Sequence, residues 1–276
     1  MAINQVIKLD GEKEEFDRNQ FRESLIRARV PVILIDDIYM KLEKKFSGEV
    51  STTKIYDFVT KILKSQHKHS LPRYATKRSL LTLGPSGFPF EMFLAKIFEA
   101  KGYTTTVGAK LKGKCVPHEV DIVAKNENEL LLVEVKFHNK TSFKTDTKVA
   151  LYIKARWDDL KNLEFVNENG PNKMTRGMIV TNTKFTNNAK RYGHCVGMDM
   201  ISFDYPKNGN LYDMMEETGL HPITCLSNLT NVQKEEIMNN GIITCSDLKK
   251  DDMVLDSIKM NKNKKRNLLD EMESVC

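Results

Sequence analysis

The stretch from His118 to Lys136 constrains the fold more than any other part of the chain, because it predicts one short β-hairpin rich in charged residues. Residues 120–123 alternate in polarity, which is typical of a half-buried strand. Residues 130–137 form a second, mostly apolar run of strand length. The polar residues 126–129 between them predict the turn. The hairpin therefore has a definite register.

That register brings two carboxylates together. If the turn is centred on Glu127 and Asn128, the numbers of facing residues add up to 255, so Asp121 faces Glu134. Facing residues on antiparallel strands lie about 4.5–5.5 Å apart at Cα. Two carboxylates at that separation repel each other unless a cation lies between them, and Mg²⁺ suits such oxygen ligands. Lys136 is two residues past Glu134 and shares its face, at roughly 6.6 Å along the strand.

The order Asp, twelve residues, Glu, one residue, Lys resembles the active site of the PD-(D/E)xK nuclease superfamily, and Mrr-like restriction endonucleases above all. The resemblance covers about residues 87–206. The other residues on which it rests are Phe90-Glu91 at a helix start, Lys101-Gly102-Tyr103 before a strand, Gly177 to Thr186 followed by Ala189, and Phe203-Asp204-Tyr205-Pro206. The proline of the superfamily name is not beside Asp121, where Val120 stands, although Pro117 is near.

The resemblance implies a central domain over about residues 85–206, a restriction-endonuclease-like α/β/α sandwich with a mixed sheet. It implies that Asp121, Glu134 and the carbonyl of Val135 bind Mg²⁺ or Mn²⁺. Lys136 would activate the attacking water, and Glu91 would support a metal-bound water. A Glu-x-Lys sequence is also common on solvated strands, and a buried Asp–Lys ion pair is a second alternative.

Three further residues are candidates for contact with nucleic acid. Arg156 and Lys154 lie on a predicted helix over 149–160, and His118 precedes Asp121 by three residues. Basic side chains near a cleavage site suit contacts with phosphates. Simpler interpretations stay open for each: the arginine pairs with one of the aspartates at 158 and 159, and the histidine is a hydrogen-bonded structural residue.

The N-terminal segment, residues 1–82, predicts a hairpin followed by four helices. A strand runs from Val6 into an Asp-Gly turn. Asp17 is predicted to cap a helix over 18–29, a second helix covers 33–46, and Ser51 caps a third. A fourth helix begins near residue 73.

This segment resembles the ATP-cone, the nucleotide-sensing domain of ribonucleotide reductases and their repressor. The residues that carry the resemblance are Val6-x-Lys8-x-Asp10-Gly11, Phe16-Asp17, Glu49-Val50-Ser51-Thr52-x-x-Ile55 and Arg73-Tyr74-Ala75. The resemblance implies that Lys8 contacts the phosphates of ATP or dATP. The family usually has an arginine after this lysine, and Leu9 replaces it here. The alternative is a cone that has become a structural or dimerising module.

The third segment, residues 222–276, predicts a small helical module. A helix over 233–239 is followed by Gly241-Ile242 and a new helix near Asp247-Leu248. This layout looks like a helix-hairpin-helix-type module, which binds DNA backbones. The segment has a single glycine where such modules have a glycine-rich hairpin.

The bulk composition limits the class of protein. The net charge of +6 permits a polyanionic partner without demanding one. No apolar run approaches the roughly 18 residues of a membrane span, and the N-terminus lacks a signal pattern, so we expect a cytoplasmic protein without membrane contact. The five cysteines are far apart and form no C-x-x-C, which argues against a structural zinc site or a disulfide framework.

Together these features predict an α/β multidomain protein. The expected function is a metal-dependent DNA endonuclease that ATP or dATP regulates, working in restriction, phage defence or DNA repair. We expect a homo-oligomer, a dimer or higher, with DNA and an adenine nucleotide as partners. Two alternatives stay open. One is an ATP-cone regulator whose central domain binds nucleic acid without cleaving it, and the other is a junction resolvase or RNA nuclease on the same fold.

Overall fold

The structure is a computed structural model that describes residues 3–9, 11–161, 164–167, 170–173 and 176–276, and for 164–167 and 170–173 the backbone alone. Asp10, part of the predicted Asp-Gly turn, lies outside the described residues. The chain forms two compact units. The first joins residues 1–80 to residues 221–276, and the second is residues 81–220.

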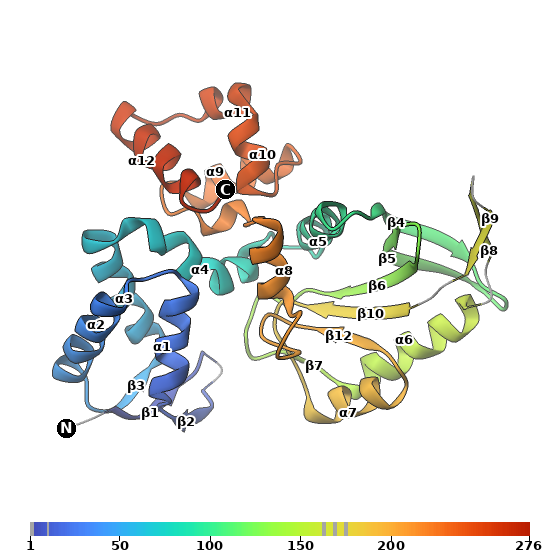
Figure 1. Ribbon diagram of the computed structural model, residues 1–276, viewed down its shortest axis with the longest axis horizontal. Coiled ribbons are helices and arrows are strands. Elements are labelled where there is room, and N and C mark those ends of the chain that lie inside the picture. Colours follow the sequence, from blue (N-terminus) through green and yellow to red (C-terminus); the bar gives the residue numbers. More distant parts are fainter. Residues whose placement is uncertain (1–2, 10, 162–163, 168–169, 174–175) are drawn as a thin grey trace. The chain divides into compact units, whose positions relative to one another are not determined.

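The first unit contains a small sheet and helices from both ends of the chain (Figure 1). Its elements are β1 (Ile3–Ile7), β2 (Lys13–Glu15), α1 (Arg18–Arg27), α2 (Val32–Lys45), β3 (Gly48–Ser51), α3 (Thr52–Gln66), α4 (Leu71–Ser79), α9 (Asn231–Asn239), α10 (Cys245–Lys250), α11 (Asp252–Ser257) and α12 (Lys262–Glu273).

The predicted helix caps of the N-terminal segment are confirmed. Asp17 accepts hydrogen bonds from the amides of Asn19 and Gln20, at 2.8 and 3.1 Å. Ser51 accepts one from the amide of Lys54 at 3.2 Å. Each cap satisfies amides that the first helical turn leaves without a partner.

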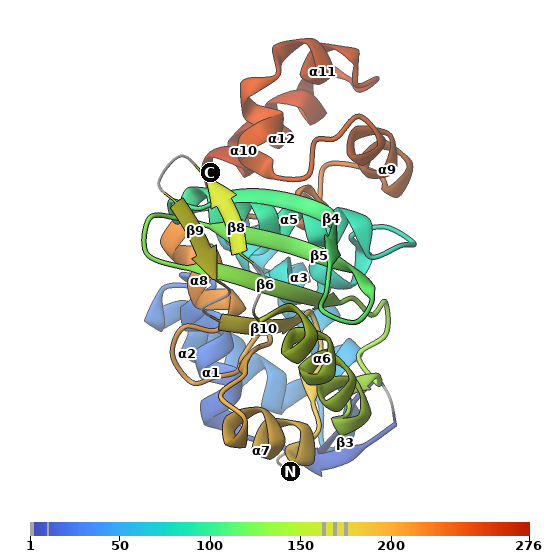
Figure 2. The same ribbon diagram turned by 90° about the vertical axis from the view of Figure 1, so that its right-hand side faces the viewer.

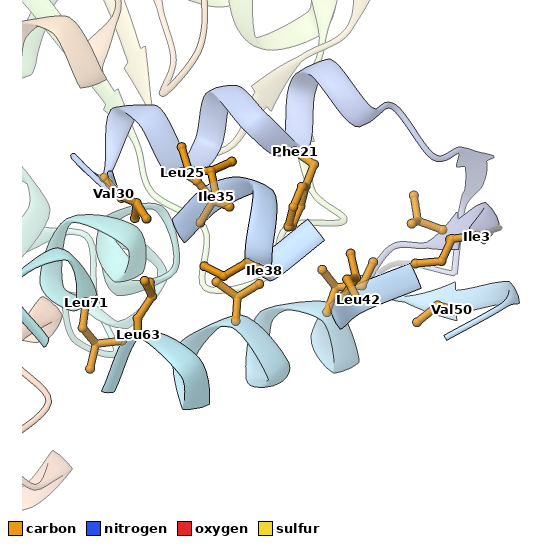
Figure 3. Packing of buried hydrophobic residues seen from close by; sticks show 14 residues of the cluster. Ile3, Phe21, Leu25, Val30, Ile35, Ile38, Leu42, Val50, Leu63 and Leu71 are labelled. Atoms are coloured by element: carbon orange, nitrogen blue, oxygen red, sulfur yellow. The ribbon is translucent and has the colours of Figure 1, made fainter. Parts of the chain in front are cut away.

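The small sheet contains more than the predicted hairpin. Its order is β2-β1-β3, with β1 antiparallel to β2 and parallel to β3. The third strand was not predicted, because residues 48–51 indicated only a helix stop and a cap. Figure 3 shows the core beneath: Ile3 and Val50 lie at the sheet end, and Val30, Leu63 and Leu71 lie at the opposite end.

The C-terminal helices have a core of their own and are joined to the N-terminal helices by polar contacts. Thr224 donates a hydrogen bond from its hydroxyl to the carbonyl of Ser79 at 2.9 Å. Lys68 and Asp270 form an ion pair at 2.9 Å. These contacts connect two segments far apart in the sequence within one unit.

The second unit is an α/β/α sandwich, as predicted. Its elements are α5 (Phe88–Ala100), β4 (Thr104–Lys112), β5 (Pro117–Lys125), β6 (Leu130–Lys136), β7 (Lys144–Thr145), α6 (Thr147–Leu160), β8 (Glu164–Asn167), β9 (Gly170–Lys173), β10 (Arg176–Thr181), β11 (Lys184–Phe185), α7 (Asn187–Cys195), β12 (Asp199–Ile201) and α8 (Leu211–Thr218).

Its central sheet has the order β12-β10-β6-β5-β4, and Figure 2 shows β4, β5, β6 and β10 side by side. Pairs β4–β5 and β5–β6 are antiparallel, whereas β6–β10 and β10–β12 are parallel. Helix α5 covers one face and helices α6 and α7 cover the other (Figure 1). Trp157 of α6 is buried in that second layer.

Among the described residues, none of the helices has the length and apolar character that crossing a membrane requires.

Candidate active site

The hairpin of β5 and β6 has the register that the sequence predicts. Ile122 pairs with Val133 and Lys125 with Leu130, so the numbers of facing residues add up to 255. The turn is closed by a hydrogen bond of 3.1 Å from the amide of Asn126 to the carbonyl of Glu129. Asp121 and Glu134 are the next residues of their strands beyond the first of these pairs. The register therefore places both carboxylates at the same end of the hairpin.

Asp121 is fixed by the neighbouring strand. Its Oδ2 accepts a hydrogen bond of 2.7 Å from the backbone amide of Val135. This bond ties the carboxylate to the segment between Glu134 and Lys136. The bond therefore fixes the orientation of the carboxylate beside β6.

Glu134 is buried and held by two cations. Only 4% of it is exposed. Its Oε1 accepts a hydrogen bond from the Nζ of Lys136 at 2.5 Å, and its Oε2 accepts one from Nη1 of Arg156. Burial raises the pKa of Glu134 and the charge of Asp121 raises it further, whereas Lys136 and Arg156 oppose the shift. The net shift is upward, so the two cations do not fully offset burial and repulsion.

Glu91 joins the cluster from α5. Its pKa is raised to about 7, first by burial and then by the charges of Asp121 and Glu134. Its carboxylate lies close to the backbone at the start of α5, since a Cβ on Gly87 would be in van der Waals contact with Oε1 of Glu91, at 3.4 Å. The four residues predicted to be catalytic, Glu91, Asp121, Glu134 and Lys136, are thus brought together by one helix and two strands.

Arg156 belongs to the same cluster, in a role that the sequence did not indicate. Its Nη1 also donates to the carbonyl of Glu119 at 3.1 Å, and its Nη2 donates to the hydroxyl of Tyr152 at 3.0 Å. The alternative in which Arg156 pairs with Asp158 or Asp159 is wrong. Packing of α6 on the sheet turns this side chain toward Glu134 instead.

Asp158 and Asp159 pair with the other two candidates for nucleic-acid contact, Lys154 and His118. Asp158 pairs with Lys154 at 2.6 Å on the exposed face of α6. Asp159 pairs with Nε2 of His118 at 2.8 Å and accepts a hydrogen bond of 2.8 Å from the amide of Cys115. Contact of Arg156, Lys154 and His118 with nucleic acid stays a prediction.

A buried polar network supports the end of β6 and was missed from the sequence. Thr181, which faces Lys136 in the parallel pairing of β6 and β10, donates a hydrogen bond to the carbonyl of Lys136 at 2.7 Å. Asn182 accepts from the amide of His138 at 2.8 Å and donates to its carbonyl at 2.7 Å. The residue run Thr181-Asn182-Thr183 at the end of an apolar strand was the available signal, since buried polar groups require partners.

The cluster fits a divalent metal by its charge. Three carboxylates, from Glu91, Asp121 and Glu134, share the electrostatic environment of two cations, and two of them have raised pKa values. A divalent ion would relieve this repulsion, and Mg²⁺ takes one or two carboxylates together with other oxygens. No group of three or more His, Cys, Asp or Glu side chains with metal-ligand geometry occurs among the described residues.

Lys8, the predicted nucleotide contact, lies in the first unit on the turn after β1. Its Nζ forms an ion pair with Glu14, and its carbonyl accepts a hydrogen bond of 3.0 Å from the amide of Gly11. Leu9 beside it is 56% exposed. The lysine therefore lies at the hairpin turn, where the sequence placed it.

Relatives of the chain share most of its length. An uncharacterized protein of Archaeoglobus fulgidus (strain ATCC 49558 / DSM 4304 / JCM 9628 / NBRC 100126 / VC-16) is 34% identical over 158 residues, which are 56% of this chain and 83% of the relative. The crystal structure of AF1548, a protein of unknown function, is 30% identical, with a TM-score of 0.54, and the match covers 69% of this chain and 98% of that chain. The chain belongs to the AF1548-like family.

Three family models divide this AF1548-like protein along its length. The ATP cone domain matches residues 4–82, the restriction endonuclease model matches residues 84–204, and the AF1548-like C-terminal model matches residues 221–276. The chain therefore joins an ATP-cone domain to an Mrr-like restriction endonuclease domain, and the predicted fusion is confirmed.

Proposed function

We propose that the second unit is a divalent-metal-dependent endonuclease that hydrolyses phosphodiester bonds in DNA. The observation that carries this proposal is the meeting of Asp121, Glu134, Lys136 and Glu91 at one end of the sheet, with Glu134 buried. The restriction endonuclease model over residues 84–204 supports the reaction class. Work in restriction, defence or repair is the setting that we infer.

The metal ligands would be Asp121, Glu134 and the carbonyl of Val135. A bound Mg²⁺ or Mn²⁺ supplies polarisation of the scissile phosphate and a lower pKa for a coordinated water. Asp121 is already oriented by the Val135 amide. Glu134 is already oriented by Lys136 and Arg156.

The chain's own groups complete the chemistry. Lys136 places an ammonium beside the carboxylates, where it orients the attacking water and offsets the negative charge that develops on the phosphate. Glu91, with a pKa of about 7, is poised to accept a hydrogen bond or a proton from water near neutral pH. Arg156 acts through Glu134 and is a positioning residue.

The first unit would regulate the second through ATP or dATP. Lys8 at the hairpin turn is the proposed phosphate contact, and the ATP cone model over residues 4–82 supports the ligand class. We also propose that the active form is a homo-oligomer, and that its response to nucleotide sets the rate of cleavage.

The test is cleavage of supercoiled, linear, branched and single-stranded DNA, and of RNA, with Mg²⁺ or Mn²⁺. The variants Asp121→Asn, Glu134→Gln and Lys136→Met should each lose at least about 100-fold in rate, because each removes a group that stabilises charge in the transition state. Lys148→Gln, which changes an exposed lysine at the start of α6, is the matched control and should cleave like the parent. Cleavage by Asp121→Asn at the parent rate would refute the site, and preference for RNA would change the substrate.

A further inference from the structure

A cavity in the first unit has no part in the proposed function. It has a volume of about 340 Å³ and lies where the N-terminal helices meet α12. Four basic side chains line it, together with two carboxylates: Arg29, His67, His69, Arg73, Asp270 and Glu273. Both chain segments that supply these residues belong to one compact unit.

The cavity lies at the far end of the helices from the hairpin. Arg29 follows the end of α1, and His67 follows the end of α3. These helices have 10 and 15 residues, and they begin next to the β2 and β3 strands. At 1.5 Å per residue they span roughly 15 and 22 Å. A ligand in the cavity would therefore be separate from a nucleotide at Lys8.

The charged side chains of the cavity favour a ligand that carries both an anionic group and hydrogen-bond donors. The guanidinium groups of Arg29 and Arg73 are always charged, and both lower the pKa of the nearby His221, after the larger effect of burial. Asp270 pairs with Lys68 at 2.9 Å, which offsets its charge. The carboxylates of Asp270 and Glu273 remain able to accept hydrogen bonds from hydroxyl groups.

Arg29 occupies a position that its backbone would assign to glycine. Its φ is +58°, the left-handed region, and it is the one non-glycine residue with positive φ among the described residues. The amides of Arg29 and Val30 donate to the carbonyls of Ile26 and Leu25, at 2.8 and 3.0 Å, which is the usual glycine-ended helix motif. This strained backbone position places the guanidinium-bearing Arg29 in the lining of the cavity.

We propose that this cavity binds a small molecule that carries a phosphomonoester next to hydroxyl groups. The guanidinium groups of Arg29 and Arg73 can donate charge-assisted hydrogen bonds to a phosphate, and the imidazoles can add further donors. The volume of about 340 Å³ is at the lower end of small-ligand sites and leaves space beyond a phosphate ion. The hydroxyl-bearing part faces Asp270 and Glu273. Such a ligand joins the N-terminal helices to the C-terminal module.

Calorimetry of the full chain tests the proposal with three probes: inorganic phosphate, ribose 5-phosphate and adenosine 5′-monophosphate. Binding of both organic phosphates assigns the site to sugar phosphates, and binding of the nucleotide alone assigns it to nucleotides; both results support the proposal. Inorganic phosphate bound as tightly as ribose 5-phosphate overturns the role of the carboxylates. No heat from any probe at millimolar concentration overturns the site.

Three variants distinguish binding in this cavity from binding at the Lys8 hairpin and from a general effect of charge. Arg29→Gly removes the guanidinium at a position whose backbone suits glycine, so affinity for the bound probe should fall by about 10- to 100-fold, and thermal unfolding without ligand checks that the variant folds. Lys54→Gln, which removes an exposed charge at the start of α3, the end away from the cavity, should bind like the parent. Lys8→Ala should also bind like the parent. Parent affinity in Arg29→Gly, or loss of affinity only in Lys8→Ala, overturns the assignment.

Discussion

At the scale of single residues, charge dominates the candidate active site. Glu91 is the residue through which we expect the free energy of unfolding to depend on pH. Its pKa is about 7 in the folded chain against an ordinary value of 4.5. The folded state therefore binds the proton more tightly than the unfolded state, and the free energy of unfolding falls as pH rises between these values. Glutamine at this position stays neutral at every pH and removes that loss.

We therefore predict that Glu91→Gln gains stability relative to the parent when the pH is raised from 5 to 8. After discounting for the partial exposure of the side chain, the gain is about 1–2 kcal/mol. Urea unfolding in EDTA, followed by the fluorescence of Trp157, the sole tryptophan, measures it in the second unit. Glu99→Gln on the same helix is the control. If the free energies of unfolding of Glu91→Gln and the parent differed by the same amount at pH 5 and at pH 8, the raised pKa of Glu91 would be contradicted.

Arg156 offers a second prediction at this scale. Without metal, Arg156→Gln leaves the buried Glu134 with one cation fewer, and we expect a loss of about 1–3 kcal/mol in the free energy of unfolding. With Mg²⁺ the loss should shrink, because the metal supplies the missing positive charge. Chemical unfolding followed by circular dichroism in EDTA and in Mg²⁺ measures both. Lys154→Gln should change stability by less than about 0.5 kcal/mol, and an equal loss of Arg156→Gln in both buffers would exclude a metal near Glu134.

Residues whose partners are set locally were predictable, and those whose partners are set by packing were not. The meeting of Asp121 and Glu134 at one end of the hairpin followed from a turn of four residues, which fixes the register of both strands. The partner of Arg156 did not follow, because the carboxylates nearest to it in the sequence are those of Asp158 and Asp159. Only the position of α6 on the sheet directs this side chain to Glu134.

Helix α6 positions Arg156 in the candidate active site, and the packing of this helix on the sheet depends on a glycine. Trp157 packs directly on Gly177 of β10, where a Cβ would overlap the indole ring. We predict that Gly177→Ala lowers the free energy of unfolding by about 1–3 kcal/mol, since overpacking must displace the helix or the strand. Cleavage should fall as well, because Arg156 moves with Trp157.

Thermal unfolding and cleavage of Gly177→Ala, side by side with Gly87→Ala, check this prediction. At Gly87 a Cβ has its nearest neighbours at 3.4 and 3.6 Å, so alanine is accommodated there. Parent stability in Gly177→Ala would show that α6 does not depend on this contact.

Elements were predictable where the signal lay within one segment. Helices α1 and α3 followed from their caps, Asp17 and Ser51. Strand β3 did not, because its partner β1 lies about 45 residues earlier in the chain and a four-residue strand is too short to show a pattern of alternation. Parallel pairing of this kind is invisible to local pattern.

For the whole molecule, the order of segments was predictable but their grouping was not. The sequence divides into three segments, whereas residues 221–276 form one unit with residues 1–80. The joining contacts, such as Lys68 with Asp270, connect residues about two hundred positions apart. Polar surface residues of this kind give no sign in the sequence of what they contact.

The last prediction concerns nucleotide control of the whole chain. Lys8 is the proposed phosphate contact, and the exposed Leu9 stands where the ATP-cone family usually has an arginine. Leu9→Arg adds a charge-assisted hydrogen bond worth about 1.5–3 kcal/mol, so affinity for ATP or dATP should rise by about 10- to 100-fold. Lys8→Ala should weaken it by a similar factor. Lys13→Ala is the matched control. It removes a lysine of the same hairpin, which pairs with Glu49 of β3. Calorimetry of the full chain measures affinity, and cleavage with and without nucleotide measures the coupling. If Leu9→Arg and the parent both give no heat with millimolar ATP or dATP, the cone is a structural module, and regulation of the nuclease unit must come from another ligand.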